Sequence, residues 1–274
     1  IGAKVEEEGS TTIPSKTLVD LVNALPKEHV EMSLTERTHT LNIMCGSYNN
    51  DIKCIDAQEF PLLPSVETEG AIELNVQDLR EMIDHVVFAA ATDDARPVLT
   101  GVEVKVDGTE LSFAAADGFR LAVRTGTLAA SAAEPLTAII PARALTELGR
   151  ISAEQRETVA MMLLPSRNQV IFQLKDVELV SQLIEGQYPD YQQLIPSSHS
   201  TSTILSTAEF LNACRAASIF ARESSYTARL KIVPGGESEN GTIEVTAKSP
   251  ETGWNETVVD ATIEGDPVEI AFNV

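Results

Sequence analysis

The chain has 274 residues, of which 43% are hydrophobic, and its formal net charge is -21 at pH 7. This length is typical of about two domains with separate cores, and the apolar content is that of an ordinary soluble globular protein. The charge argues against binding nucleic acid or anionic membranes over the whole surface, and no apolar run approaches the roughly 18 residues of a membrane span. Three cysteines without metal-ligand spacing (Cys45, Cys54 and Cys214) favour reduced thiols in a cytoplasmic protein.

The first predicted unit is a helix followed by three strands. Residues 15–26 place apolar side chains at i, i+3, i+4 and i+7, the spacing of an amphipathic helix. Strands are predicted at 30–34, 41–45 and 51–55. The chain begins without methionine and ends at Val274 within a continuing pattern, so we expect it to be part of a longer protein.

The second unit repeats this order of signals. A short strand at 72–74 precedes a predicted helix at 77–90, whose apolar residues lie on one side. Over 102–113, apolar residues alternate with polar ones on both sides of Asp107-Gly108, a sequence typical of a hairpin turn.

The third and fourth units follow the same plan. The third has a predicted helix over 141–150 that begins at a proline, where the missing N–H has no cost. The predicted strands of the third unit are 159–164, 169–174 and 178–183. The fourth unit is predicted to have a helix at 208–222 and strands at 228–233, 242–247 and 254–261.

Two internal repeats relate these units. Residues 13–21 recur at 140–148 with the proline, one basic position, one acidic position and both leucines in place. Residues 74–89 resemble 205–221. Repeats of this length indicate duplicated domains rather than solenoid units. We therefore predict an α+β fold in which 67–199 is a complete domain, 1–66 is the second half of one domain and 200–274 the first half of another. Polar stretches at 65–70 and 197–203 are the expected linkers.

The predicted helices are less acidic than the rest of the chain. Windows 16–27, 78–85, 143–156 and 209–223 hold as many basic as acidic residues, so the negative excess lies in strands and loops. A shared helical face would then be far less negative than the rest and more accessible to phosphate. The alternative is that these cations simply occupy solvated helix faces. The basic residues are Lys16, Lys27, Arg80, Arg143, Arg150, Arg156, Arg215 and Arg222.

No strong catalytic or metal signature is present. The sequence lacks a glycine-rich phosphate loop, a G-x-S-x-G elbow and a His-Glu-x-x-His motif. Asp93-Asp94 permits a hydrolase that uses a metal, but no further oxygen ligand follows at a loop spacing, which favours a solvated turn. Asp117-Gly118 is most simply a tight turn between strands.

Three segments resemble one family. Asp117-Gly118-Phe119-Arg120-Leu121-Ala122-Val123 is similar to the D-G-[HY]-R-L-A segment of the bacterial DNA polymerase III beta subunit, the sliding clamp. Residues 185–191, continuing to Ile195-Pro196, resemble its G-x-[FY]-P-D-Y…P segment, and 270–274 resemble the start of its last helical unit. The resemblance covers essentially the whole chain in order.

This resemblance implies a DNA clamp fold with helices on one face and sheets on the other. Two protomers of three domains each would close a ring around duplex DNA, with the helices lining it. The ring tethers the replicative polymerase, so the implied partners are double-stranded DNA, the polymerase catalytic subunit, a clamp loader and other proteins with clamp-binding peptides. The implied role is that of an accessory replication subunit, with no catalytic activity, cofactor or metal.

The resemblance also assigns site residues. One departure from the family is Gln193, which stands where arginine is common. The implied peptide-binding pocket consists of Leu99, Gly118, Phe119, Arg120, Leu121, Pro189, Gln193, Leu194, Tyr226 and Asn273. Without the resemblance, the leucines in this set would be read as core residues. Such a set would suit a short extended peptide carrying leucine and an aromatic anchor.

For DNA, Lys16 is the best match to a family position, and the DNA-facing set is Lys16, Lys27, Arg80, Arg143, Arg150, Arg215 and Arg222. Asp93, Pro97 and Val98 occupy a loop in which the best-known members contact DNA through polar and aromatic groups. The implied dimer interface pairs an edge strand at Asn50 and Ile52 with Phe220 and Trp254 of the other protomer. The alternative function is an acidic peptide-binding module of the same fold that does not encircle DNA.

Overall fold

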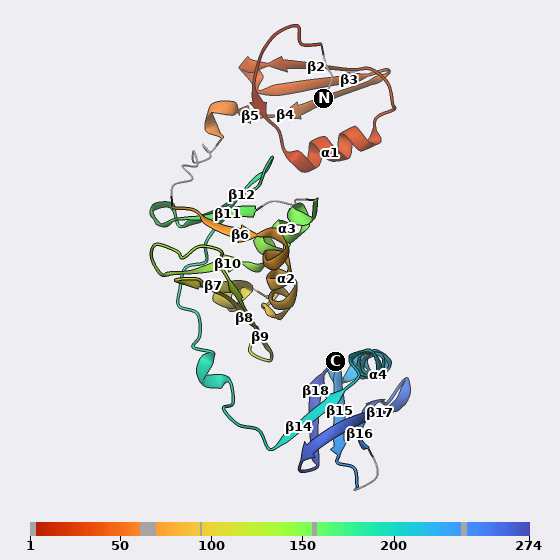
Figure 1. Ribbon diagram of the computed structural model, residues 1–274. Helices are drawn as coiled ribbons and strands as arrows, with labels where there is room; N and C mark the ends of the chain where they lie inside the picture. The colour runs from red at the N-terminus through yellow and green to blue at the C-terminus, as the bar shows by residue number, and fades with distance from the viewer. Residues whose placement is uncertain (1–3, 61–69, 94, 155–157, 237–239) are drawn as a thin grey trace. The chain divides into compact units, whose positions relative to one another are not determined.

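The computed structural model describes residues 4–60, 70–93, 95–154, 158–236 and 240–274, which form two compact units, Ile1–Ile72 and Glu73–Val274 (Figure 1). Asp94, Arg156 and the predicted boundary between residues 66 and 67 lie outside the described residues. No helix within the described ranges is long and apolar enough to cross a membrane.

The first unit is a three-stranded sheet covered by one helix. Its α1 packs Leu18 and Leu21 against buried Leu41 and Ile43 of the sheet. The third strand begins at Tyr48, earlier than predicted, because Gly46 adopts a left-handed φ of 55° and lets Cys45 pair directly with Tyr48. Its elements are β1 (Thr11–Thr12), α1 (Ser15–Ala24), β2 (Val30–Thr35), β3 (Thr40–Cys45), β4 (Tyr48–Lys53) and β5 (Ile55–Asp56), with sheet order β2-β3-β4 and β1 paired to β5.

The next part of the chain contains two copies of the helix-plus-strands unit. In the first copy, the Asn75 side chain caps α2 by accepting from the N–H groups of Gln77 and Asp78. The helices and strands are β6 (Ile72–Asn75), α2 (Val76–Val86), β7 (Gly101–Asp107), β8 (Glu110–Ala116), β9 (Leu121–Thr127), β10 (Leu136–Pro141), α3 (Ala142–Ile151), β11 (Thr158–Leu164), β12 (Gln169–Gln173) and β13 (Glu178–Gln182).

An exchange of strands joins these two copies. The sheets have the orders β10-β7-β8-β9 and β13-β12-β11-β6, so the strand before each helix pairs with the other copy. In β7, Val102, Val104 and Val106 are fully buried, whereas Glu103 and Lys105 occupy the alternate positions and point to the other face of the sheet. Helices α2 and α3 pack side by side (Figure 1).

The C-terminal part has one helix on a five-stranded antiparallel sheet. Ala213, Ala217 and Ala221 of α4 are buried against Val245 and its neighbours, so small side chains allow close approach of helix and sheet. The elements are β14 (Thr201–Leu205), α4 (Thr207–Ala221), β15 (Thr227–Val233), β16 (Gly241–Ser249), β17 (Gly253–Gly265) and β18 (Val268–Asn273), in the sheet order β14-β17-β16-β15-β18.

Short 3-10 helices occupy several connections. The helix predicted over 77–90 ends at Val86 because the chain then tightens into one of these turns. Strand β14 begins at Thr201, inside the predicted linker 197–203. The 3-10 helices are η1 (Glu36–Thr38), η2 (Ala57–Glu59), η3 (Val87–Ala89), η4 (Pro97–Thr100), η5 (Ser152–Glu154), η6 (Pro165–Arg167), η7 (Gln192–Leu194) and η8 (Arg222–Ser224).

The structure confirms the predicted α+β class. Each of α1, α2, α3 and α4 is followed by three antiparallel strands, as the four-unit pattern predicts. The strands β1, β10, β14 and β18 were not predicted.

Candidate functional site

A tight turn between β8 and β9 carries Gly118, Phe119 and Arg120. The Oδ1 atom of Asp117 accepts hydrogen bonds from the N–H groups of Phe119 at 2.9 Å and Arg120 at 3.1 Å. Its Oδ2 accepts from Nε of Arg120 at 3.0 Å. Gly118 has a φ of 90°, which glycine adopts without steric cost. The turn therefore orients Arg120 and presents Phe119.

Two opposing effects act on the pKa of Asp117. Partial burial raises the pKa because it disfavours the charged form, whereas the N–H groups of Phe119 and Arg120 and the Arg120 guanidinium stabilise the carboxylate. The hydrogen bonds and the nearby positive charge together prevail, so the pKa lies below its ordinary value. The carboxylate is therefore the form that orders the turn at neutral pH.

Two exposed aromatic rings lie at this turn, one within it and one in contact with Arg120. Phe119 is 94% exposed and Phe88 of η3 is 58% exposed. The Arg120 guanidinium lies 5.7 Å from the centre of the Phe88 ring, a cation–π contact. Arg96 also holds the turn, since its Nη2 donates to the carbonyl oxygen of Asp117 at 2.7 Å.

An apolar cluster lies behind the turn. Leu99 is buried in it, and Leu121 packs against it from the start of β9. Tyr188 and Tyr191, from the segment after β13, are also buried members of this cluster. Two predicted pocket leucines therefore share one cluster with the chain segment that carries Pro189 and Leu194.

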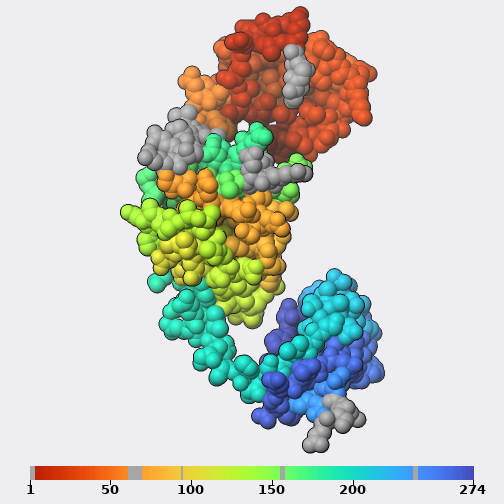
Figure 2. Space-filling view, viewed as in Figure 1, coloured from red at the N-terminus to blue at the C-terminus, as the bar shows by residue number. Residues whose placement is uncertain are grey.

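That segment exposes the other predicted pocket residues. Pro189 and Gln193 lie at the surface, and Gln193 Nε2 donates to Asp190 Oδ2 at 2.6 Å. Leu194, at the end of η7, is 73% exposed. Residues 192–200 are exposed throughout, and Figure 2 shows this turquoise stretch as an uncovered run of surface atoms.

The last two predicted pocket residues form a separate group in the C-terminal part. Tyr226 and Asn273 lie at one end of the paired strands β15 and β18. Asn273 Nδ2 donates to the carbonyl oxygen of Ser225 at 2.8 Å, and Val274 N–H donates to that of Tyr226 at 2.7 Å. Both predicted side chains are exposed.

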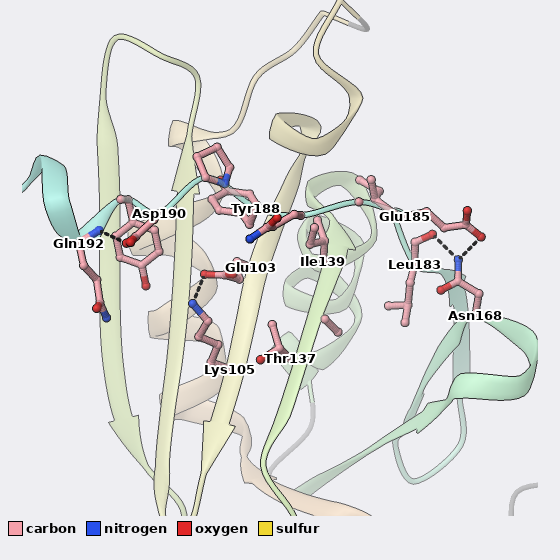
Figure 3. A pocket seen from close by; sticks show the side chains of 16 residues that line it. Glu103, Lys105, Thr137, Ile139, Asn168, Leu183, Glu185, Tyr188, Asp190 and Gln192 are labelled. Carbon is pink, nitrogen blue, oxygen red and sulfur yellow. Dashed lines mark hydrogen bonds and ion pairs between the residues drawn. The ribbon is translucent and has the colours of Figure 1, made fainter.

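A cavity of about 700 Å³ lies over β7 and β10, lined by residues of the segment that contains Tyr188 (Figure 3). Of the predicted pocket residues, Pro189 alone lines it. Glu103 Oε2 lies 2.8 Å from Lys105 Nζ, and Lys105 lies 5.6 Å from the centre of the Tyr191 ring. The contact with Glu103 raises the pKa of Lys105 against the opposing effect of burial.

The predicted DNA-facing residues occupy several kinds of position. Lys16 and Arg143 are each the second residue of their helix, α1 and α3, and both are exposed. Arg215 on α4 is exposed, whereas Arg80 on α2 is half-buried. The remaining three lie outside an α-helix or are already paired. Lys27 follows the end of α1, Arg222 begins η8 and Arg150 forms an ion pair with Glu147 at 2.7 Å.

The predicted interface residues differ in exposure. Asn50 lies on β4, an edge strand, but the Ile52 side chain is buried in the core of its own unit, so only the backbone edge is available there. Trp254 is exposed near the start of β17, and half-buried Phe220 packs against the core. Strand β14 pairs only with residues 261–265 of β17, which leaves the Trp254 end without a partner on that side among the described residues.

The alternative metal site involves Asp93. Its Oδ1 accepts a hydrogen bond from Ala95 N–H at 3.0 Å, which is the geometry of a local turn. Within the part of the chain that the structure describes, no three His, Cys, Asp or Glu side chains form a group that could hold a metal ion.

Comparison with known proteins gives a consistent result along the chain. Family models of the DNA polymerase III beta subunit match in order: the N-terminal domain at residues 1–64, the central domain at 73–190 and the C-terminal domain at 192–274. The beta sliding clamp of Synechococcus elongatus is 34% identical over 273 residues, which is 99% of this chain and 72% of that protein. That of Staphylococcus aureus is 35% identical over 270 residues, covering 98% of this chain and 69% of its own length.

The chain belongs to the DNA polymerase III beta subunit family.

Solved structures of this family share the fold. The DNA polymerase sliding clamp of Bacillus subtilis superimposes with a TM-score of 0.82 at 33% identity, covering 98% of this chain and 70% of that one. The beta subunit of Thermotoga maritima gives a TM-score of 0.78 at 26% identity, with coverages of 99% and 71%. The clamp fold expected from the three motifs is therefore confirmed.

Three residues next to the predicted pocket residues were not predicted from the sequence. Phe88, Arg96 and Tyr188 contact predicted pocket residues or the backbone beside them, yet each lies outside the predicted set. Tyr188 stands in the motif at 185–191, which was the one available signal. No local pattern marks Phe88 or Arg96, because their partners lie more than 20 positions away.

Proposed function

We propose that this clamp-family chain contributes to a ring around duplex DNA and tethers the replicative polymerase through the surface formed by Phe119, Leu121 and Leu194. The observation that carries the tethering role is the exposure of Phe119 and Leu194 beside the buried Leu99 cluster. Exposed apolar side chains next to a packed cluster are typical of sites that bind a short peptide.

The peptide surface has a distinct chemistry. Leu121 and Leu194 supply apolar contacts, while Arg120 offers guanidinium N–H groups beside the Phe88 ring. An extended peptide carrying leucine and an aromatic residue would bury these groups. Tyr226 and Asn273 are proposed to contact the same peptide. Other replication and repair proteins with similar peptides, and the clamp loader, are proposed to use this surface too.

The charge distribution supports the DNA role. Lys16, Arg143 and Arg215 are exposed on α1, α3 and α4, whereas the chain as a whole has a charge of -21. Phosphates are attracted by the helix cations and repelled by the acidic remainder. Because a closed ring retains DNA by enclosure, weak contacts without base recognition are sufficient. This role is accessory and non-catalytic, and its proposed location is the cytoplasm.

Ring closure is proposed to join two copies of the protein. The free edge of β4 and the part of β17 near Trp254 are each able to accept a strand, since main-chain groups of an edge strand pair readily with another chain. The side-chain contacts proposed here are those of Asn50, Phe220 and Trp254.

The second candidate is an acidic peptide-binding module that does not encircle DNA. Val98 favours it, because this residue packs against the apolar cluster and Gly186 instead of facing outward. Peptide binding without any topological retention on DNA would support this candidate over the ring.

Peptide binding is tested by fluorescence polarisation with a labelled synthetic peptide that contains leucine and phenylalanine. We expect saturable binding that an unlabelled copy of the peptide displaces. A peptide of the same length and charge, with alanine in place of leucine and phenylalanine, is the control. Equal binding of both peptides would contradict the proposed site.

A further inference from the structure

Two separate chain segments form the peptide surface in residues 99–194. The turn at 117–120 and the start of β9 supply Phe119 and Leu121, while the segment after β13 supplies Pro189 and Leu194. A peptide that contacts both segments binds well only when their spacing is fixed in advance, because ordering them on binding would cost affinity.

One hydrogen bond links these segments at the positions next to the pocket residues. The backbone N–H of Ala116 donates to Oη of Tyr188 at 2.9 Å. Ala116 is the last residue of β8 and immediately precedes Asp117, which organises the turn. Tyr188 immediately precedes Pro189. The bond therefore links the two chain segments that carry the proposed pocket residues.

The end of the β7–β8 pairing and the packing of the Tyr188 ring hold the two partners of this bond in place. The pairing of β7 with β8 ends at Glu103 and Ala114, so the Tyr188 hydroxyl supplies an acceptor where β7 no longer runs beside β8. Tyr188 is buried, and its ring packs in the cluster that contains Leu99. Without this acceptor, the part-buried N–H of Ala116 would have to move or bind water, and either outcome disturbs the turn.

We infer that Tyr188 is a positioning residue, whose hydroxyl fixes the turn that carries Phe119 relative to the segment that carries Leu194. This inference rests on the proposed peptide-binding function. It assigns a role in partner affinity to a side chain that is too deeply buried to provide the exposed contact surface itself.

Tyr191 provides a matched control. It belongs to the same segment and is buried in the same cluster, and its ring contacts Lys105. In the described part of the chain its hydroxyl makes no hydrogen bond, as the bonds of this segment involve Tyr188, Asp190 and the backbone. Tyr188→Phe and Tyr191→Phe each remove one hydroxyl and keep a ring in the same buried cluster, so they differ mainly in the bond to Ala116.

The test compares peptide affinity, melting temperature and the amide NMR shift of Ala116 in the wild type and both variants. Tyr188→Phe is expected to weaken binding about three- to tenfold, the usual effect of removing one hydrogen bond, and to shift the Ala116 amide. Tyr191→Phe is expected to bind within about twofold of the wild type. Melting temperature separates this effect from a general loss of stability.

Each outcome has a separate meaning. Wild-type affinity in Tyr188→Phe, or equal weakening in both variants, would overturn the positioning role while the proposed function stands. A wild-type protein that does not bind the leucine- and phenylalanine-containing peptide would overturn the proposed function and this inference with it.

Discussion

Leu194 presents its apolar side chain to solvent, and this makes it the cleanest residue for testing peptide binding. Leu194→Asp is expected to weaken peptide binding about 10- to 30-fold, because a charge replaces an apolar anchor. Stability should change by no more than about 0.5 kcal/mol, since Leu194 is 73% exposed. Fluorescence polarisation and thermal unfolding measure the two effects.

Ile204→Asp is the matched control for Leu194→Asp. Ile204 is 72% exposed, but it lies on β14 and is not part of the proposed surface. Peptide affinity should stay at the wild-type level in this variant. Equal losses of affinity in both variants would show that peptide binding depends on surface charge in general and not on Leu194.

The lowered pKa of Asp117 predicts how the stability of the fold depends on pH. Its pKa is lowered in the folded protein, so its carboxylate stabilises the fold above the unfolded pKa of about 3.9, and this contribution is lost as pH falls through the folded value. Urea unfolding of the wild type and Asp117→Asn from pH 7 to pH 3 should show a stability difference that shrinks below about pH 4. A difference that does not depend on pH would mean that the charge of Asp117 has no role.

Individual residues differed in how far the sequence could place them. The motif around Gly118 predicted a tight turn, because a glycine after aspartate is a local signal, and φ at Gly118 is indeed positive. The family resemblance assigned Ile52 to the dimer interface, and the structure adds that its side chain is buried in the core of its own unit. The bond from Ala116 to Tyr188 spans 72 positions, and no local pattern could predict it.

At the level of elements, the repeated helices depend on leucines that pack against the sheet at matching places. Leu145 of α3 has no exposed surface, and Leu18 occupies the corresponding position of α1, packed against its sheet. Leu145→Ala is expected to destabilise the protein by about 2–5 kcal/mol, because it removes buried methyl groups and leaves a cavity. Arg143→Gln, two positions earlier and exposed, should change stability by less than about 0.5 kcal/mol. Urea unfolding compares the two variants, and similar losses would contradict the packing of α3.

The order of elements was predicted well, but their pairing was not. Apolar periodicity identified the helix and three strands of the first, third and fourth units and the helix and hairpin of the second, because each element buries one side. The exchange of β6 and β10 between sheets was not predicted. Strand partners depend on contacts between distant segments, and a run such as Leu136–Pro141 contains no information about its neighbour.

At the scale of the whole molecule, the location of positive charge matters more than its amount. Replacing Lys16, Arg143 and Arg215 with glutamine should reduce DNA association, and the slope of log affinity against log salt should fall by about 0.9 for each phosphate that is no longer neutralised. As the control, replacing exposed Lys53, Lys175 and Lys248 with glutamine changes the net charge by the same amount but keeps the positive charges on the helices. Filter binding across a salt series compares both triple variants, and identical losses would refute a DNA-facing helical surface.

Encirclement of DNA distinguishes the ring from a simple peptide-binding module, and topological retention measures it. The protein is loaded onto circular duplex DNA, part of the sample is linearised with a restriction enzyme, and gel filtration then measures the protein that remains bound. We expect retention on the circle and loss from the linear form, because a ring slides off free ends. Equal loss from both forms, with peptide binding intact, would contradict the ring.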